Sequence, residues 1–161
     1  MRTDLLLRLF LCFTIATPLM VLAQEPGSIL VVNSENLDTY WINEKKVAPE
    51  YPTKSLRKGE EGCVAVGFII EADGTTSAHR AITFHPSNNF TQSAIRAAKQ
   101  FRYIPSEQNA GRNAVFTTNS FTFQISSRKK FDEQKQQRLA EICTAAANKA
   151  LNVDTSNAGA G

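Results

Sequence analysis

The stretch that decides the fold is Gly62-Cys63-Val64-Ala65-Val66-Gly67-Phe68-Ile69-Ile70, followed closely by Asp73-Gly74. Every second residue from Val64 to Ile70 is a branched or aromatic hydrophobic, so an extended chain presents them on one face. Asp73-Gly74 is a strong hairpin signal, because glycine takes positive φ without steric cost. The run from Thr75 to Phe84 is therefore expected to return as the second strand of a hairpin.

Downstream of the hairpin, the segment from Phe90 to Tyr103 predicts a helix that Pro105 ends. Its apolar residues recur at spacings of four, three and four and so share one face: Phe90, Ala94, Ala97 and Phe101. The segment from Val115 to Ile125 predicts a third strand. The order strand, strand, helix, strand indicates an α+β fold, with a small three-stranded antiparallel sheet and one packed helix.

The other face of the first strand is unusual, because Cys63, Ala65, Gly67 and Ile69 are small or apolar where a solvated face would carry charges. A second layer is expected to cover it, and the C-terminal helix predicted over residues 127–151 is the candidate. Its apolar stripe comprises Phe131, Leu139, Ile142, Cys143, Ala146 and Ala150. The hypothesis includes a Cys63–Cys143 disulfide, with two unrelated cysteines as the alternative. Residues 152–161 are expected to form a disordered tail.

Residues 1–23 have the layout of a secretory signal cut before Gln24. Arg2 and Arg8 precede an uncharged, mostly apolar run from Leu9 to Val21. This predicts a periplasmic protein, in which an oxidising compartment permits the disulfide. The alternative is an uncleaved anchor over residues 5–23 in the inner membrane, the only case in which a membrane is a partner. Residues 24–46 are interpreted as a lead-in segment.

The composition favours no catalytic, metal or cofactor site. A net charge of +3, from 18 basic and 15 acidic residues, does not indicate a nucleic-acid binder. The two histidines have no partner at metal-ligand spacing, and no serine stands in a nucleophile elbow. The protein is therefore expected to be a non-enzyme.

The domain over residues 47–126 resembles the C-terminal domain of the TonB family. The resemblance rests on Pro49-x-Tyr51-Pro52, Gly59-Glu60-Glu61-Gly62, the alternating strand with Asp73-Gly74, and Phe101-x-Tyr103-x-Pro105 after the helix. It implies a protein-binding module for envelope transport, whose partner is an envelope protein or peptide such as an outer-membrane receptor. It also implies a grip by strand addition at a final edge strand. The partner-binding residues expected from it are Val115, Thr117, Asn119, Phe121, Pro49 and Tyr51.

The resemblance leaves a second function open, a membrane-anchored energy transducer that couples an inner-membrane motor to outer-membrane receptors. Transducers of the family usually have a long Pro-rich spacer and a histidine in the anchor. Here the lead-in holds a single proline, and residues 5–23 hold no histidine. Both differences favour the periplasmic module. An open edge strand would also allow self-association.

Overall fold

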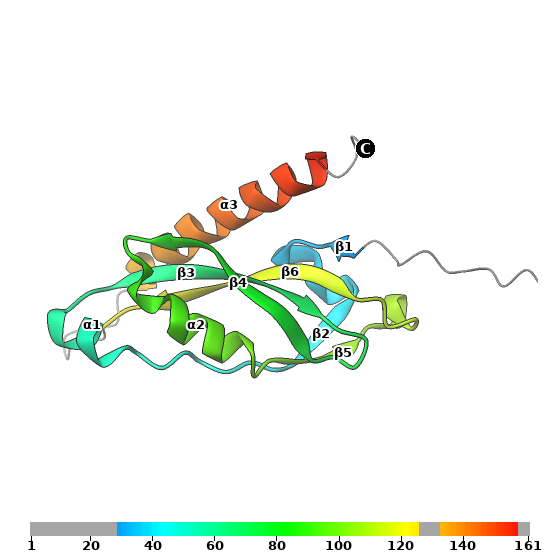
Figure 1. Ribbon diagram of the computed structural model, residues 1–161, viewed down its shortest axis with the longest axis horizontal. Coiled ribbons are helices and arrows are strands. Elements are labelled where there is room, and N and C mark those ends of the chain that lie inside the picture. Colours follow the sequence, from blue (N-terminus) through cyan, green and yellow to red (C-terminus); the bar gives the residue numbers. More distant parts are fainter. Residues whose placement is uncertain (1–28, 126–132, 158–161) are drawn as a thin grey trace, which may run out of the picture.

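The computed structural model describes residues 29–125 and 133–157, which form two sheets with helices on both sides of the larger one (Figure 1). The larger sheet has the strand order β1-β6-β3-β4, and the smaller sheet pairs β2 with β5. The strands are β1 (Leu30–Val31), β2 (Trp41–Lys45), β3 (Gly62–Ile70), β4 (Thr76–His85), β5 (Arg102–Pro105) and β6 (Val115–Phe123). The helices are α1 (Thr53–Lys58), α2 (Thr91–Ala98) and α3 (Glu133–Asn157), with short 3-10 turns η1 (Ser34–Thr39), η2 (Asn88–Phe90) and η3 (Glu107–Asn109). The predicted signal or anchor at residues 1–23 lies outside the described residues.

Strand β3 lies between β4 and β6 and carries the main core on one face. The alternating side chains from Val64 to Ile70 are fully buried, as the period-two pattern predicts. The predicted helix face is also buried against them, and Phe90 stacks on Phe123 with ring centroids 4.4 Å apart. Burial of each large apolar side chain stabilises the fold by about 1.5–3 kcal/mol. The hairpin, the helix and the third strand expected from the sequence therefore share one core.

The tip of the β3–β4 hairpin is docked instead of free. Gly74 has φ +81°, and its N–H donates to the Glu71 carbonyl at 2.8 Å. Its own carbonyl accepts the Tyr103 N–H at 2.9 Å. A Cβ at this position would overlap the Tyr103 carbonyl oxygen, so glycine is required by conformation and by close approach.

The helix expected from Phe90 to Tyr103 is longer than the helix in the structure. The helix α2 ends at Ala98, and the chain then extends as β5, antiparallel to β2 with Ile42 opposite Ile104. The residues after α2 alternate between buried Phe101 and Tyr103 and exposed Arg102 and Ile104. This period of two is strand-like, and the pairing with β2, which is distant in sequence, determined the outcome.

The sheet has four strands where three were expected, because the lead-in contributes to the fold. Its branched run places Leu30 opposite Val115 and Val31 opposite Phe116 in a parallel pairing. The residues Val32, Leu37 and Trp41 then enter the main core. Trp41 is fully buried, and its indole N–H donates to the Asn113 carbonyl at 3.0 Å. The segment is therefore part of the folded unit.

The helix α3 forms the expected second layer, on the side of the sheet opposite α2 (Figure 1). Cys63 and Ala65 of β3 pack against Cys143 and Ala147, with Leu139 and Ile82 at the margin of the cluster. The predicted stripe needs correction, because Ile142 and Ala146 are exposed while Ala147 and Leu151 are buried. The buried face recurs every four residues from Leu139, as helical geometry requires once Cys143 is fixed. Phe131 lies outside the described residues.

The C-terminal boundary also differs from the prediction. The helix α3 continues to Asn157, so residues 152–157, which were expected to belong to a disordered tail, are helical. The sequence there has small and polar residues without a helix-breaking glycine or proline before Gly159. Nothing in it therefore ends a helix that is already anchored by its earlier turns.

Candidate protein interface

The outer edge of β6 is covered by β1 over only two residues. The Val32 N–H donates to the Phe116 carbonyl at 2.9 Å, so Phe116 directs its main-chain groups away from β3. Because these directions alternate along a strand, Thr118, Ser120 and Thr122 direct their N–H and C=O groups the same way. Within the described residues, only the Asn119 side chain bonds any of these groups, donating to the Ser120 carbonyl at 3.2 Å. Past Phe116 no described strand pairs with this edge, but η1 contacts β6 and Thr118 is buried, so the accessible part of the edge begins at Ser120.

The residues expected to contact a partner on this strand point elsewhere. The side chains of Val115, Thr117 and Phe121 are buried on the core side of the sheet. Their main-chain groups pair with β3, where Thr117 lies opposite Phe68 and Phe121 opposite Val64. Asn119 is partly exposed. The main chain of the even-numbered residues, and not these side chains, is what β6 offers at its edge.

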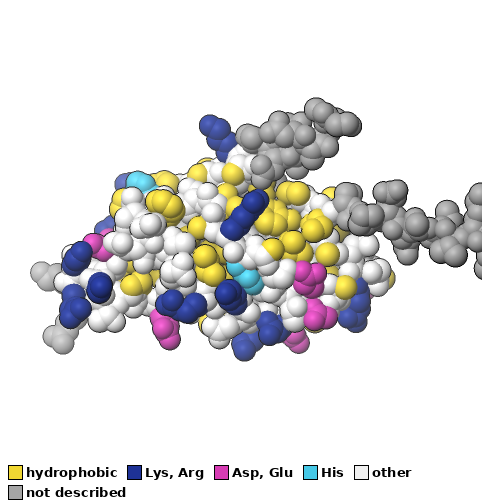
Figure 2. All heavy atoms as spheres, viewed as in Figure 1, with side chains coloured by type: hydrophobic (Ala, Val, Ile, Leu, Met, Phe, Trp, Pro, Cys, Tyr) yellow, Lys and Arg dark blue, Asp and Glu magenta, His cyan; other side chains and the backbone are white. Residues whose placement is uncertain are grey.

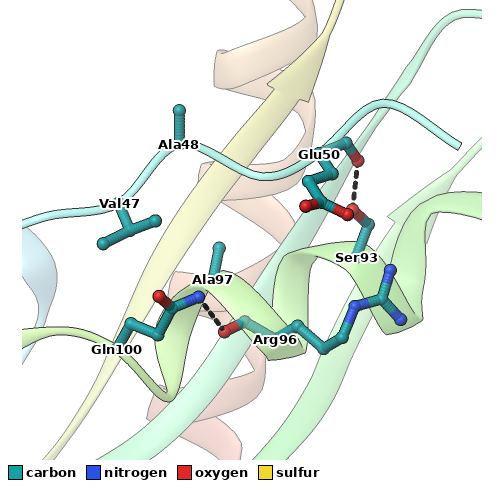
Figure 3. A pocket seen from close by; sticks show the side chains of 7 residues that line it. All are labelled: Val47, Ala48, Glu50, Ser93, Arg96, Ala97 and Gln100. Atoms are coloured by element: carbon teal, nitrogen blue, oxygen red, sulfur yellow. Dashed lines mark hydrogen bonds between the residues drawn. The ribbon is translucent and has the colours of Figure 1, made fainter.

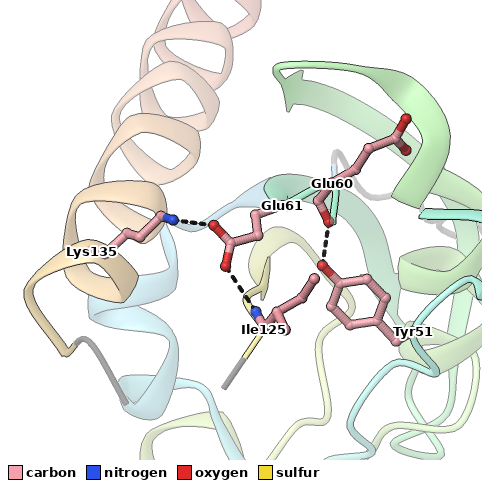
Figure 4. A network of polar contacts seen from close by, with 5 residues as sticks. All are labelled: Tyr51, Glu60, Glu61, Ile125 and Lys135. Atoms are coloured by element: carbon pink, nitrogen blue, oxygen red, sulfur yellow. Dashed lines mark hydrogen bonds and ion pairs between the residues drawn. The ribbon is translucent and has the colours of Figure 1, made fainter. Parts of the chain in front are cut away.

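Tyr51, in the extended segment before α1, packs against the core. Its ring packs edge-on against Phe90 and Phe123, at centroid distances of 5.6 and 5.7 Å. Its hydroxyl donates to the Glu60 carbonyl (Figure 4). Burial raises the pKa of the Tyr51 hydroxyl, and the charges of Glu61 and Glu60 raise it further. Pro49 is partly buried beside it, so the structure assigns neither residue a free binding side chain.

Glu61 joins the end of β6 to the start of α3. Its carboxylate accepts the Ile125 N–H at 2.9 Å and pairs with Lys135 (Figure 4). In the sequence, Glu61 stood out only as part of the Gly59-Glu60-Glu61-Gly62 motif that leads into β3. Its two partners are distant in the chain, so no local signal identified this role.

Further along, α3 is bonded to side chains of β6. The Thr144 hydroxyl donates to the Ser120 hydroxyl at 2.9 Å, and the Gln136 amide lies 3.5 Å from the Thr122 hydroxyl. These contacts lie on the outer face of the sheet. The main-chain edge of β6 stays free of α3 hydrogen bonds within the described residues.

The predicted Cys63–Cys143 disulfide is present and clamps α3 to the centre of the sheet. The two Cα atoms are 6.1 Å apart, and both residues are fully buried. The bond joins positions separated by 80 residues. The bond holds α3 against the sheet, where α3 also contacts the side chains of β6.

A surface groove separates the extended segment before α1 from α2 (Figure 3). Its cavity is about 340 Å³ and is lined by Val47, Ala48, Glu50, Ser93, Arg96, Ala97 and Gln100. The Ser93 hydroxyl donates to the Glu50 carbonyl, and the Gln100 amide donates to the Arg96 carbonyl at 3.1 Å. The first of these bonds holds the segment to α2, and the second lies within the helical region. The groove was not identified from the sequence, which gave no sign that the segment runs along α2.

The remaining part of the described surface carries charged side chains of both signs. Lys and Arg side chains over α1 and α2 are interspersed with carboxylates (Figure 2), so no single-sign patch dominates the described part of that face.

His79 stacks on Phe68 and contacts the Thr76 hydroxyl. Burial lowers the pKa of His79, and the charge of Lys99 lowers it further. No group of three potential metal ligands occurs in residues 29–125 and 133–157. No helix in these ranges is long and apolar enough to cross a membrane.

Comparisons with known proteins identify related domains. The family model described as Gram-negative bacterial TonB protein C-terminal matches residues 47–125. The solution structure of the Pseudomonas aeruginosa TonB C-terminal domain is 24% identical, with 61% of this chain and 97% of that chain covered and a TM-score of 0.49. TonB2 of Vibrio anguillarum is 25% identical, with coverages of 53% and 82% and a TM-score of 0.43. The Helicobacter pylori TonB domain is 22% identical, with coverages of 49% and 71% and a TM-score of 0.39. No curated protein matches the chain.

Proposed function

From the premise that residues 47–125 belong to the TonB C-terminal domain family, we propose that this chain binds an extended segment of an envelope protein as an added strand on β6. The family points to envelope transport, to a periplasmic or other envelope location, and to a receptor-type partner. On this proposal the chain acts by binding and carries out no reaction.

The open edge of β6 is the observation that supports the proposal. At Ser120 and Thr122, which are partly exposed, the N–H and C=O groups point away from β3 and lie past the end of β1. Unpaired main-chain groups in a row bind an extended peptide irrespective of its side chains. At about 3.3 Å per residue, this stretch pairs with roughly three residues of a partner strand.

The other edge of the sheet is less suitable for strand addition. Strand β4 pairs with β3 through two register shifts, and Ala78 within it has φ 48°. Bulges and left-handed residues bend a strand, so its main-chain groups no longer form a straight row. Strand β6 pairs with β3 without a register shift. We therefore assign the partner to β6.

The proposal is tested by removing one outward N–H without disturbing the β3 pairing. The variant Thr122→Pro does this, since proline lacks the donor and is tolerated on edge strands. A photoreactive residue at Asn119, which is partly exposed, reports the partner in intact envelopes. We expect a specific crosslink with Thr122 present, retention of the crosslink with Thr122→Val, and its loss with Thr122→Pro.

Two controls make the result decisive. The fluorescence of Trp41, the only tryptophan, must show the same unfolding midpoint in the valine and proline variants, which excludes a folding defect. The same photoreactive residue placed at exposed Glu107 should give no comparable crosslink. Equal crosslinking from Asn119 in the folded proline variant would show that the partner does not use this edge.

A further inference from the structure

The segment that precedes β2 lies on the same edge of β6 to which the partner is proposed to bind. Strand β1 is the end strand of the larger sheet and pairs in parallel with Val115 and Phe116 (Figure 1). The turn η1 follows directly and also contacts β6. Residues 29–39, named here the cover segment, leave the edge accessible only from Ser120 onward, since Thr118 is buried.

The cover segment lies outside the part of the chain that matches the TonB family model. That part begins at residue 47 and contains β3, β4 and β6. The edge of β6 therefore belongs to the domain that the family shares, whereas a preceding segment of the same chain supplies its cover. Because β1 is itself a strand added to β6, it occupies the place that the proposed function gives to the partner.

The contact of β1 with β6 is short. Its ladder has two residue pairs, whereas the ladder between β3 and β6 has nine. Val32 adds one bond, from its N–H to the Phe116 carbonyl at 2.9 Å. The side chains of Ile29 and Leu30 are 46% and 44% exposed, so they bury little apolar area. A short ladder with exposed side chains opens at a low cost in free energy, while the rest of the domain stays folded.

The side chains of the cover segment that do enter the core are apolar. Val32 and Leu37 are buried in the main cluster together with Val115. A strand that displaces the cover segment has to fill the space that Val32 leaves, because an unfilled cavity destabilises the core. A branched apolar residue meets this need and is also favoured in strands.

We infer that the cover segment is an internal competitor for the β6 edge, which the partner strand displaces. The inference rests on the proposed strand addition. Release of the cover segment adds the outward main-chain groups of Phe116 and Thr118 to those of Ser120 and Thr122. The partner is then an extended segment with a branched apolar residue where Val32 now lies. Its apparent affinity is reduced by the fraction of molecules in which the cover segment is closed.

Hydrogen exchange of the free exported protein tests the release without any partner. The amide of Val32, which bonds to Phe116, should exchange at least about tenfold faster than the amides of Val64 and Val66 in the central strand. Its exchange rate should also respond less to low concentrations of urea, because local opening exposes little surface. Equal rates for the three amides would show that the cover segment opens only with the whole domain. That result would overturn the inference, whatever binds to the edge.

A disulfide between β1 and β6 tests the competition itself. Val31 and Phe116 are opposite each other, and neighbouring strands lie about 4.8 Å apart, a distance that a disulfide spans. The variant Val31→Cys/Phe116→Cys holds the cover segment closed, and Val31→Ser/Phe116→Ser is its matched control. With the photoreactive residue at Asn119, the closed variant should give about tenfold less partner crosslink than the control. Intact mass confirms the added bond, and Trp41 fluorescence confirms that both variants are folded.

A peptide with the sequence of residues 27–34 serves as a probe of known composition. By fluorescence anisotropy it should bind the serine control at least about tenfold more tightly than the closed variant. The same peptide with asparagine in place of Val32 should bind the control more weakly. Equal binding of the first peptide to the two variants, including none to either, would overturn the inference.

The crosslinks separate this inference from the proposed function. Equal crosslinking in the closed variant and its control, together with loss of the crosslink in Thr122→Pro, would refute the competition and leave strand addition standing. Loss of the crosslink in the closed variant, together with full crosslinking in Thr122→Pro, would instead refute pairing at Thr122 and leave the competition standing.

Discussion

Breaking the Cys63–Cys143 bond should remove a large part of the stability of the fold. The bond joins residues separated by 80 positions, a loop that contains most of the domain. On the chain-entropy estimate, closing a loop of this length in the unfolded state contributes about 4–5 kcal/mol. Domains of this size are stable by only about 5–15 kcal/mol, so the loss is roughly a quarter or more of the total.

The measurement is urea unfolding of the exported protein, oxidised and reduced, followed by Trp41 fluorescence. Trp41 lies in the main core and not in the small cluster under α3, so it reports the domain itself. The double variant Cys63→Ala/Cys143→Ala should match the reduced protein. Thr144→Ala, which removes only the bond to Ser120, should cost about 1 kcal/mol. Equal unfolding midpoints for the oxidised, reduced and double-alanine proteins would refute the reasoning, as would two free thiols in the intact mass of the unreduced protein.

Three further predictions concern other parts of the chain. Gly74→Ala should lower the free energy of unfolding in urea by roughly 2–4 kcal/mol, because the added Cβ meets the Tyr103 carbonyl at positive φ. Gly59→Ala, at φ +67° with no atom near the added Cβ, should lower it by only about 1 kcal/mol. Similar losses for the two variants would contradict the close-approach argument. The pKa of His79 is lowered in the folded state, so its contribution to stability should be complete above the unfolded pKa of 6.5 and should decrease as the pH falls below 6.5. His79→Gln should weaken this dependence of stability on pH. An NMR titration that places the pKa of folded His79 above 6.5 would reverse the expected direction of the pH dependence. Terminal sequencing of the exported protein should find Gln24 first, and a retained residue 1 would favour the anchored transducer.

The sequence determined the elements whose signals are local. The alternation from Val64 to Ile70 lies within β3, and the Asp73-Gly74 turn joins β3 to β4. The helical spacing of Phe90, Ala94 and Ala97 runs from η2 into α2, and each of these local signals is borne out. The second-face argument worked for a related reason. A solvated face would carry polar or charged residues, so the small apolar residues Cys63 and Ala65 implied that a second layer covers this face.

The pairing of strands that are distant in the chain could not be predicted from the sequence. Residues 102–105 carry both the end of a helical pattern and an alternation, and only the presence of Trp41–Lys45 alongside makes them a strand. The same holds for Leu30–Val31, a short branched run that becomes a strand because β6 offers it an edge. Strand pairing depends on what lies beside a segment, which a single sequence does not show.

The candidate site shows the division most clearly. The resemblance to the TonB family implied that the strand expected from Val115 to Ile125 binds the partner. The tertiary structure decided which of its atoms face outward and how much of the edge β1 leaves uncovered. Side-chain direction along an isolated strand is fixed only to within a choice of two faces, and the direction of its main-chain groups only to within a choice of two sides. The core packing of Val115 and Phe121 resolves the first choice, and the bond from Val32 to Phe116 resolves the second. Both contacts join segments far apart in the chain, and for that physical reason only the folded molecule contains them.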